Sequence, residues 1–184
     1  PSTIYCLLVT CIVSYAFQGN SSVTGVTIAD SVASIGDYAF ASCTSLSTLS
    51  LPDGVASIGN SAFSGCTGLT SASIGNGLKA ISDYAFISCY NLSNIAIGSN
   101  VTSIGTGAFY SCGNLNSITI PVAVTNIGSY AFYYCKSMTN VAAVNSVTRI
   151  GDHAFASCTS LEGVTIPNVV GIGPYAFYSC AKLN

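Results

Sequence analysis

Residues 32–54, VASIGDYAFASCTSLSTLSLPDG, contain the pattern that decides the fold. All eight phenylalanines of the 184-residue chain stand at the position of Phe40, one in each successive copy of this stretch. The copies follow every 23 residues, except that the last interval, from Phe155 to Phe177, is 22. A residue type confined to one position of a short period indicates stacked copies of one structural unit.

Apolar residues recur at fixed positions of this unit and predict its core. The position of Ile35 holds Ile in the other copies, and that of Leu46 holds Leu or Met in the later copies. Stacking would place these side chains above one another, pointing inward. The alternation in 46–51 predicts a short strand, and 32–36 predicts a second, shorter one. Residues 37–43 have apolar spacings of three and four, which predict a single helical or 3₁₀ turn. Successive units would pair as parallel strands.

The pattern Leu46-x-x-Leu49-x-Leu51 within such a period is the leucine-rich-repeat signature. With the added Ile-Gly-x-x-Ala-Phe-x-x-Cys of residues 35–43, nearly the whole chain resembles the BspA-like, or Treponema-type, leucine-rich repeat family. The resemblance implies a curved right-handed solenoid with a parallel sheet on the concave face and short strands and helical or 3₁₀ turns on the convex face. It also implies a surface or secreted protein involved in adhesion, and it carries over no catalytic residues.

We therefore expect a single domain over residues 1–184, with about eight coils and uncapped ends, in which 1–22 form a degenerate first repeat. The apolar run 4–13 has a rival interpretation, because its length is that of a signal-peptide core. We favour the repeat, since Val9, Ile12 and Phe17 match the positions of Val32, Ile35 and Phe40. The run is too short to span a bilayer.

Composition limits the function. Charged residues make up only 5% of the chain, against about 25% in a typical domain. The four cations Lys79, Lys136, Arg149 and Lys182 are spread along the sequence, so no basic patch for nucleic acid is expected. A surface this neutral suits a protein that associates with others or carries glycans. We expect an extracellular or cell-surface location.

Seven of the nine cysteines share one position of the unit: Cys43, Cys66, Cys89, Cys112, Cys135, Cys158 and Cys180. Parallel stacking does not readily give the geometry of a disulfide, so buried thiols are the favoured prediction. Some disulfides are the alternative, and Cys6 and Cys11, which lie off this position, could pair with each other. Metal binding is least favoured, because no C-x-x-C motif exists. No cofactor is expected.

The ionisable residues form no catalytic constellation, so no enzyme is expected. His153 stands at the position of Tyr38 and Tyr130, which predicts a ring that substitutes for tyrosine. Asp37, Asp83 and Asp152 precede the turn and are predicted to cap its free N–H groups.

Three N-x-Ser/Thr sequons occur, at Asn20, Asn91 and Asn100. Asn20 occupies the position of Cys43 and is therefore expected to point inward. Asn91 and Asn100 flank the main strand and should be exposed, which makes them the candidate glycosylation sites.

Two surfaces are candidates for binding. The strand face consists mainly of Ser, Thr and Asn and lacks the Trp, Tyr and Arg that dominate interface hot spots. Tyrosines gather instead near the convex turns, and this stripe is the favoured surface for a protein or carbohydrate: Tyr90, Tyr110, Tyr133, Tyr134 and Tyr178.

The two chain ends allow two interpretations. Leu183 and Asn184 begin a strand that Thr3, Ile4 and Tyr5 of another copy could complete, giving a head-to-tail homopolymer. Alternatively, the chain is an excerpt of a longer protein. The preferred function is a non-enzymatic structural module that stacks into a fibre or stalk. The alternative is a surface adhesin segment that binds a host protein or glycan.

Overall fold

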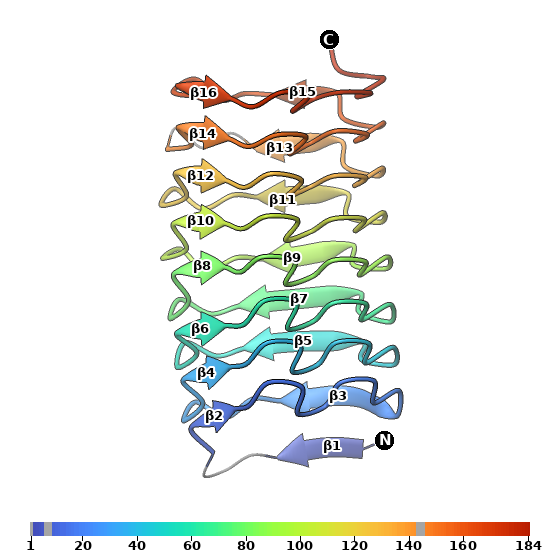
Figure 1. Cartoon of the computed structure of the whole chain (residues 1–184), viewed down its shortest axis with the longest axis vertical. Coiled ribbons are helices and arrows are strands. Elements are labelled where there is room, and N and C mark those ends of the chain that lie inside the picture. The colour runs from blue at the N-terminus through green and yellow to red at the C-terminus, as the bar shows by residue number, and fades with distance from the viewer. Residues whose placement is uncertain (1, 6–8, 143–145) are drawn as a thin grey trace.

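The computed structural model describes residues 2–5, 9–142 and 146–184, which wind into a solenoid whose coils stack along one axis, with the two termini at opposite ends (Figure 1). Strands form on two sides of each coil. The first side holds β1 (Ser2–Tyr5), β3 (Val23–Thr27), β5 (Thr48–Leu51), β7 (Ser71–Ile74), β9 (Asn94–Ala96), β11 (Ser117–Thr119), β13 (Asn140–Ala142) and β15 (Gly163–Val164). The second side holds β2 (Cys11–Ile12), β4 (Ser34–Ile35), β6 (Ser57–Ile58), β8 (Ala80–Ile81), β10 (Ser103–Ile104), β12 (Asn126–Ile127), β14 (Arg149–Ile150) and β16 (Gly171–Ile172).

The paired strands in the described part of the chain are parallel, and most partners differ by one repeat, as Leu49 with Ala72 and Ile104 with Ile127 show. The predicted solenoid of parallel strands with a 23-residue period is therefore confirmed, with seven full turns between β1 and β15.

The core is a column of identical side chains, as the repeat predicted. From Phe40 to Phe155 the rings are fully buried and stack at centroid distances of 5.1–5.5 Å. The leucine, isoleucine and cysteine positions of the inner coils are buried around this column. Each coil therefore covers the apolar face of its neighbour, which is how repeat proteins obtain their stability.

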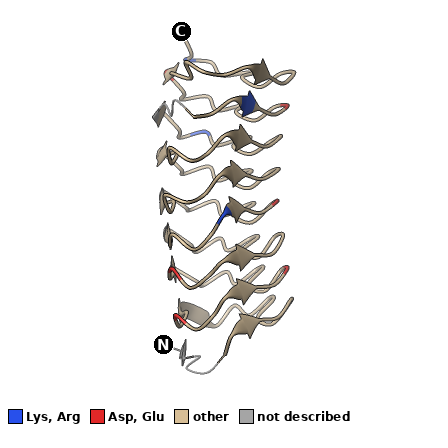
Figure 2. Cartoon of the chain, turned by 90° about the vertical axis from the view of Figure 1, so that its left-hand side faces the viewer, with Lys and Arg blue, Asp and Glu red and all other residues tan. Residues whose placement is uncertain are grey.

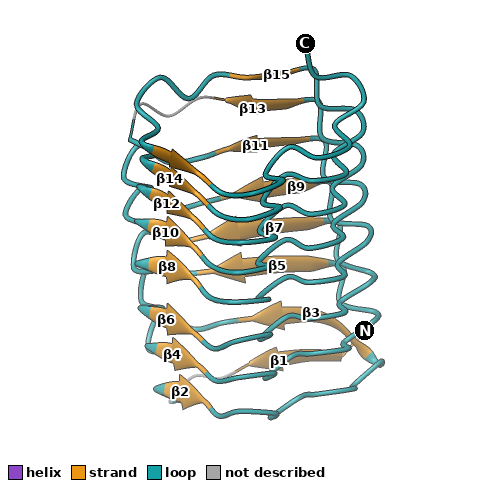
Figure 3. Ribbon diagram, turned by 45° about the horizontal axis from the view of Figure 1, so that its top comes forward, coloured by secondary structure: helices purple, strands orange, loops and turns teal. Residues whose placement is uncertain are grey.

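The predicted helical turn at 37–43 is wrong: within the described residues the strands are joined by turns and loops, and no helix forms (Figure 3). The reason lies in the direction of the N–H groups. Those of Ala39, Ala41 and Cys43 donate to the carbonyl three residues earlier, whereas those of Tyr38, Phe40 and Ser42 donate to carbonyls of the next coil. Every second N–H group of this segment thus donates to the next coil, whereas the N–H groups of a helix donate to carbonyls of the same helix.

This alternation requires a left-handed backbone at two positions of each turn. Tyr38 has φ 53° and Ser42 has φ 59°, and the equivalent residues of the other coils repeat these values. Glycine occupies these same two positions at Gly19, Gly65 and Gly107, as expected for a conformation that an L side chain adopts only at a cost.

Strand pairing is interrupted once on each side of the rod. The break lies between β9 and β11 on the first side and between β6 and β8 on the second. At the second break, Ser82 follows Ile81, whereas glycine follows the equivalent isoleucine in the neighbouring coils. A Cβ at Gly59 or Gly105 would collide with the coil before it, so Ser82 cannot approach as closely as a glycine. Its hydroxyl instead donates to Ile58 O at 2.6 Å, in place of the usual backbone N–H.

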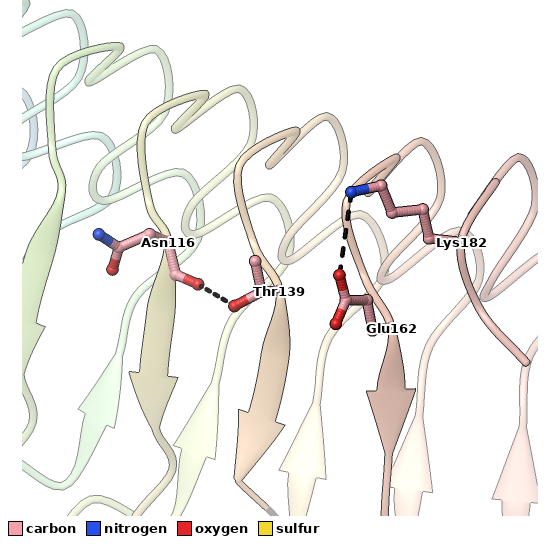
Figure 4. A network of polar contacts seen from close by, with 4 residues as sticks. All are labelled: Asn116, Thr139, Glu162 and Lys182. Carbon is pink, nitrogen blue, oxygen red and sulfur yellow. Dashed lines mark hydrogen bonds and ion pairs between the residues drawn. The ribbon is translucent and has the colours of Figure 1, made fainter.

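Charged residues are sparse along the rod (Figure 2). Hydroxyl groups provide many of the polar contacts between coils, as where Thr139 Oγ1 donates to Asn116 O at 3.3 Å (Figure 4). Lys182 and Glu162 form an ion pair at 3.8 Å with both side chains exposed (Figure 4), which is worth little in stability.

Candidate binding surface

One side of the rod carries a continuous group of aromatic rings on its turns. The rings of Tyr130, His153 and Tyr175 stack in a row, at centroid distances of 4.9 and 5.0 Å. These residues share the first left-handed position of the turn, with φ between 54° and 58°. Stacked coils therefore place the rings directly above one another.

A second row lies three residues later in the turns and contacts the first. Tyr133 stacks on Tyr110 at 4.9 Å and meets Tyr130 edge to face at 5.7 Å. Tyr134 stacks on Tyr133 at 5.4 Å, and Tyr178 meets Tyr175 edge to face at 6.0 Å. We call these seven residues the aromatic surface: Tyr110, Tyr130, Tyr133, Tyr134, His153, Tyr175 and Tyr178.

The sequence identified part of this surface. Tyr110, Tyr133, Tyr134 and Tyr178 belong to it, whereas Tyr90 is exposed but makes no ring contact within the described part of the chain. Tyr130, His153 and Tyr175 were missed as binding residues, although His153 was correctly expected to substitute for a tyrosine ring. The sequence feature that could have identified them is a pair of tyrosines three residues apart, which occurs at 130–133 and at 175–178.

The aromatic surface carries little charge. Lys136 Nζ lies 4.3 Å from the centre of the Tyr134 ring, within the range of a cation–π contact. The pKa of Tyr110 is raised, first by loss of hydration and then by the neighbouring phenols, Tyr133 foremost.

The predicted aspartate caps act on the next coil and not on their own turn. Asp37 Oδ1 accepts from the N–H of Asn60, and Asp83 Oδ1 accepts from that of Thr106, both at 2.7 Å. The residue equivalent to Thr106 in the coil after Asp152 is Pro174, which has no N–H. Within the described chain, no hydrogen bond reaches the Asp152 carboxylate.

The repeat cysteines are free thiols, and those from Cys43 to Cys158 are buried, as predicted. Burial raises the pKa of Cys89 and of Cys158 to about 12, and it raises that of Cys112 well above the ordinary 9.0. A thiol that stays protonated is neither a nucleophile nor a metal ligand. Cys11 is exposed, and Cys6 lies outside the described residues.

No group of three or more His, Cys, Asp or Glu side chains within 9–141 and 146–184 is arranged to hold a metal ion. His153 Nδ1 is buried between the flanking tyrosine rings and has no hydrogen-bond partner there. None of the residues that the structure describes belongs to a helix long and apolar enough to cross a membrane.

Asn91 and Asn100 are exposed, and each Nδ2 donates at 2.8 Å to a carbonyl of the preceding coil. Their glycosylation stays a prediction. The expectation for Asn20 is wrong, because this side chain is exposed and its Oδ1 accepts from the N–H and hydroxyl of Ser22. An outward turn of this kind satisfies the amide, which burial beside the core would leave unpaired.

The residues proposed for end-to-end assembly lie at the two extremes of the rod. Thr3, Ile4 and Tyr5 belong to β1, whose backbone pairs with β3. Leu183 is partly buried against the core, and Asn184 is exposed. Within one chain these groups do not meet.

Several solved structures share this architecture. A leucine-rich repeat protein of T. pallidum is 31% identical, with a TM-score of 0.87, and the match covers 95% of this chain and 82% of that one. A leucine-rich cell surface protein of Faecalibacterium prausnitzii is 27% identical, with a TM-score of 0.57 and coverage of 99% and 67%. The pneumococcal vaccine antigen PcpA, at 20% identity, a TM-score of 0.61 and coverage of 93% and 46%, shows the fold alone.

Among curated proteins, no significant match exists. The family model for the BspA type leucine-rich repeat region matches residues 10–139 and 125–184, almost the whole chain. Together with the repeat pattern and the stacked parallel coils, this shows that the chain belongs to the BspA-type leucine-rich repeat family.

Proposed function

We propose that this chain is a non-enzymatic module of a cell-surface or secreted protein and that it binds its partner through the aromatic surface. One observation carries the proposal: six of the eleven tyrosines and the only histidine form one continuous set of ring contacts on a single side of the rod. Scattered exposed aromatic residues are ordinary, whereas contiguous ones mark interaction sites. The F. prausnitzii relative, described as a cell surface protein, supports the location.

The proposal includes the statement that the module is not an enzyme. The buried thiols are held protonated, and His153 lies between two rings with no hydroxyl or carboxylate hydrogen-bonded to its Nδ1. Neither arrangement provides the nucleophile and base that catalysis requires.

The chain itself offers a variant that removes the surface without harming the fold. Equivalent coils carry Ala at the position of Tyr133 (Ala41, Ala156) and Ser at that of Tyr134 (Ser111, Ser157). The double variant Tyr133→Ala/Tyr134→Ser therefore uses residues that this fold already accepts. Tyr90→Thr is the matched control, because the equivalent positions hold Thr67 and Thr159.

The test is retention of fluorescent beads coated with the chain on surfaces coated with fibronectin, collagen or mucin. We expect retention on at least one surface, loss of retention in the double variant, and no change in Tyr90→Thr. Equal retention of the double variant and the unmodified chain would show that binding uses another face.

Head-to-tail stacking is a second candidate, favoured by the regular spacing at both ends of the described rod. The rings of Phe17 and Phe40 lie 5.0 Å apart and those of Phe155 and Phe177 lie 5.4 Å apart, close to the interior values. A further coil could continue this stack, whether it belongs to the same chain or to a second copy. Sedimentation velocity over a wide concentration range decides: growing assemblies that Leu183→Asp abolishes support stacking, and a monomer throughout rejects it.

A further inference from the structure

We propose that the aromatic surface binds a short, uncharged oligosaccharide, with the Asp152 carboxylate accepting hydrogen bonds from its hydroxyl groups. This inference rests on the proposed function and names the ligand. Four observations support it. They are the small number of residues in the aromatic surface, the left-handed backbone of Tyr134, the Asp152 carboxylate that accepts no hydrogen bond within the described chain, and the low charge of the surface.

The surface is too small for a stable protein interface. Such interfaces use roughly 20–30 residues on each side, whereas the aromatic surface has seven, over the turns of four successive coils. The coil-to-coil step of 4.9–5.0 Å between its rings is comparable to the length of one pyranose ring. A short saccharide lying along the rod would therefore meet one ring position per sugar unit.

Tyr134 occupies a position where the fold alone would not place a bulky ring. Its φ is 64°, and the equivalent residues are Ser42, Ser88, Ser111, Ser157 and Ser179, together with Gly19 and Gly65. A bulky residue in the left-handed region is strained, and such strain is concentrated at functional sites. The strain places an exposed ring on the aromatic surface, stacked on Tyr133 and beneath Lys136.

Asp152 provides an acceptor that the backbone does not use. Its counterparts Asp37 and Asp83 each accept an N–H from the next coil, but Pro174 removes that donor. The carboxylate lies against Gly173, so it stands at the step between the coils of His153 and Tyr175. A carboxylate accepts hydrogen bonds through both oxygens and can thus bind adjacent hydroxyls of a sugar.

The remaining chemistry suits a neutral ligand. Phenol rings combine an apolar body with a hydroxyl that donates or accepts, which fits the apolar C–H faces and hydroxyls of a pyranose. Lys136 and Asp152 bring one positive and one negative charge, so the surface has no net attraction for an anionic polymer. The chain as a whole has a formal net charge of only −2.

The experiment titrates the intact chain with neutral trisaccharides of glucose, galactose, mannose and N-acetylglucosamine at millimolar concentration. Binding is followed by saturation-transfer NMR and by tyrosine fluorescence, which is unobscured because the chain has no Trp. The variants are Tyr133→Ala/Tyr134→Ser, Asp152→Asn and the control Tyr90→Thr. Circular dichroism verifies that each variant is folded.

We expect at least one trisaccharide to bind, with affinity weakened on the order of tenfold by each of the first two variants and unchanged in the control. Binding that Asp152→Asn leaves intact, or no binding to any of the four sugars, would overturn the inference. If enzymatically deglycosylated coated surfaces still retain the unmodified chain but not the double variant, the proposed function holds and the ligand is a protein.

Discussion

At the scale of the residue, each repeat cysteine joins two coils through its thiol. Cys112 Sγ donates to Phe86 O at 3.2 Å, and the same carbonyl accepts the N–H of Cys89. This contact recurs from Cys43 to Cys180 at 3.1–3.2 Å. Deprotonation would remove the donor and place a charge in an apolar core, so the fold requires the neutral thiol.

The thiols therefore make stability depend on pH in the alkaline range. Their pKa in the folded chain is raised from 9.0, to about 12 at Cys89, so the unfolded chain loses these protons first as pH rises. We expect the free energy of unfolding to be highest below pH 9 and to fall between pH 9 and 12. Urea unfolding in reducing buffer across this range measures the fall.

Tyrosines also titrate in this range, so a difference between variants isolates the thiol effect. Cys112→Val fills a similar space without a titrating group, and the fall should be shallower in this variant than in the unmodified chain. An identical pH dependence in both proteins would show that the buried thiols do not govern it.

The sequence predicted that these cysteines are buried thiols, because identical residues at one repeat position stack in parallel. It could not predict their acceptors, since the carbonyl lies 26 residues away and its direction depends on the turn. The same limit explains Asn20, which shares the cysteine position but turns outward to cap Ser22. The repeat position predicts where the backbone of a residue lies in the coil. The polarity of the side chain then decides whether it points toward the core or toward solvent.

At the scale of the element, one close backbone contact sets the spacing of the second side of the rod. A Cβ on Gly128 would lie 2.6–2.8 Å from backbone atoms of Gly105 and Thr106, which cannot move aside. Gly128→Ala should therefore lower the free energy of unfolding by about 1–3 kcal/mol. Gly163→Ala is the control, because nothing lies within 4 Å of its added Cβ; denaturant unfolding should show no loss there. Equal losses in the two variants would show that the close approach at Gly128 is not the cause of the destabilisation.

The aspartates that bridge coils give a second pair of variants. Asp83→Ala removes the acceptor of the Thr106 N–H and should cost about 0.5–2 kcal/mol, as for a lost helix cap. Asp152→Ala should cost less than about 0.5 kcal/mol, because Pro174 leaves it no N–H to accept. Thermal or urea unfolding of the two variants measures the difference. A larger loss in Asp152→Ala would contradict the bridging role.

The strands were predictable and the turn was not. Alternation at 46–51 correctly indicated β5, but the spacing of three and four at 37–43 is shared by a helical turn and by this tighter one. The distinguishing feature is the positive φ of Tyr38 and Ser42, and neither residue type signals it. The glycines at 19, 65 and 107 did mark these two positions, and they are the sequence signal that distinguishes the two turns. The aromatic surface depends on the same turn, which explains why only part of it was recognised.

At the scale of the whole molecule, stability should behave as a sum over neighbouring coils, since each coil packs mainly on the one before and the one after it. Deleting residues 56–78 joins Val55 to Lys79 and removes one complete 23-residue repeat. Every later residue keeps its position within its repeat, because Lys79 is the equivalent of Ala56. The ring of Phe40 would then stack directly on that of Phe86. We expect the shortened chain to fold cooperatively, with an unchanged circular dichroism spectrum per residue and a stability lowered in proportion to its length.

A deletion of half a repeat tests whether the repeat position or merely the composition matters. Removing residues 56–67 would leave Gly68 where Ala56 stood, so the residues that follow would no longer continue the coil that begins at Val55. In that coil Thr70 would take the place of Ile58 and Gly75 that of Phe63, so the phenylalanine column would be interrupted and the neighbouring coils would face a gap in the core. We expect this variant to aggregate or to lose its cooperative urea transition. If both shortened chains folded equally well, the stacking of equivalent residues on neighbouring coils would not be the source of this protein's stability.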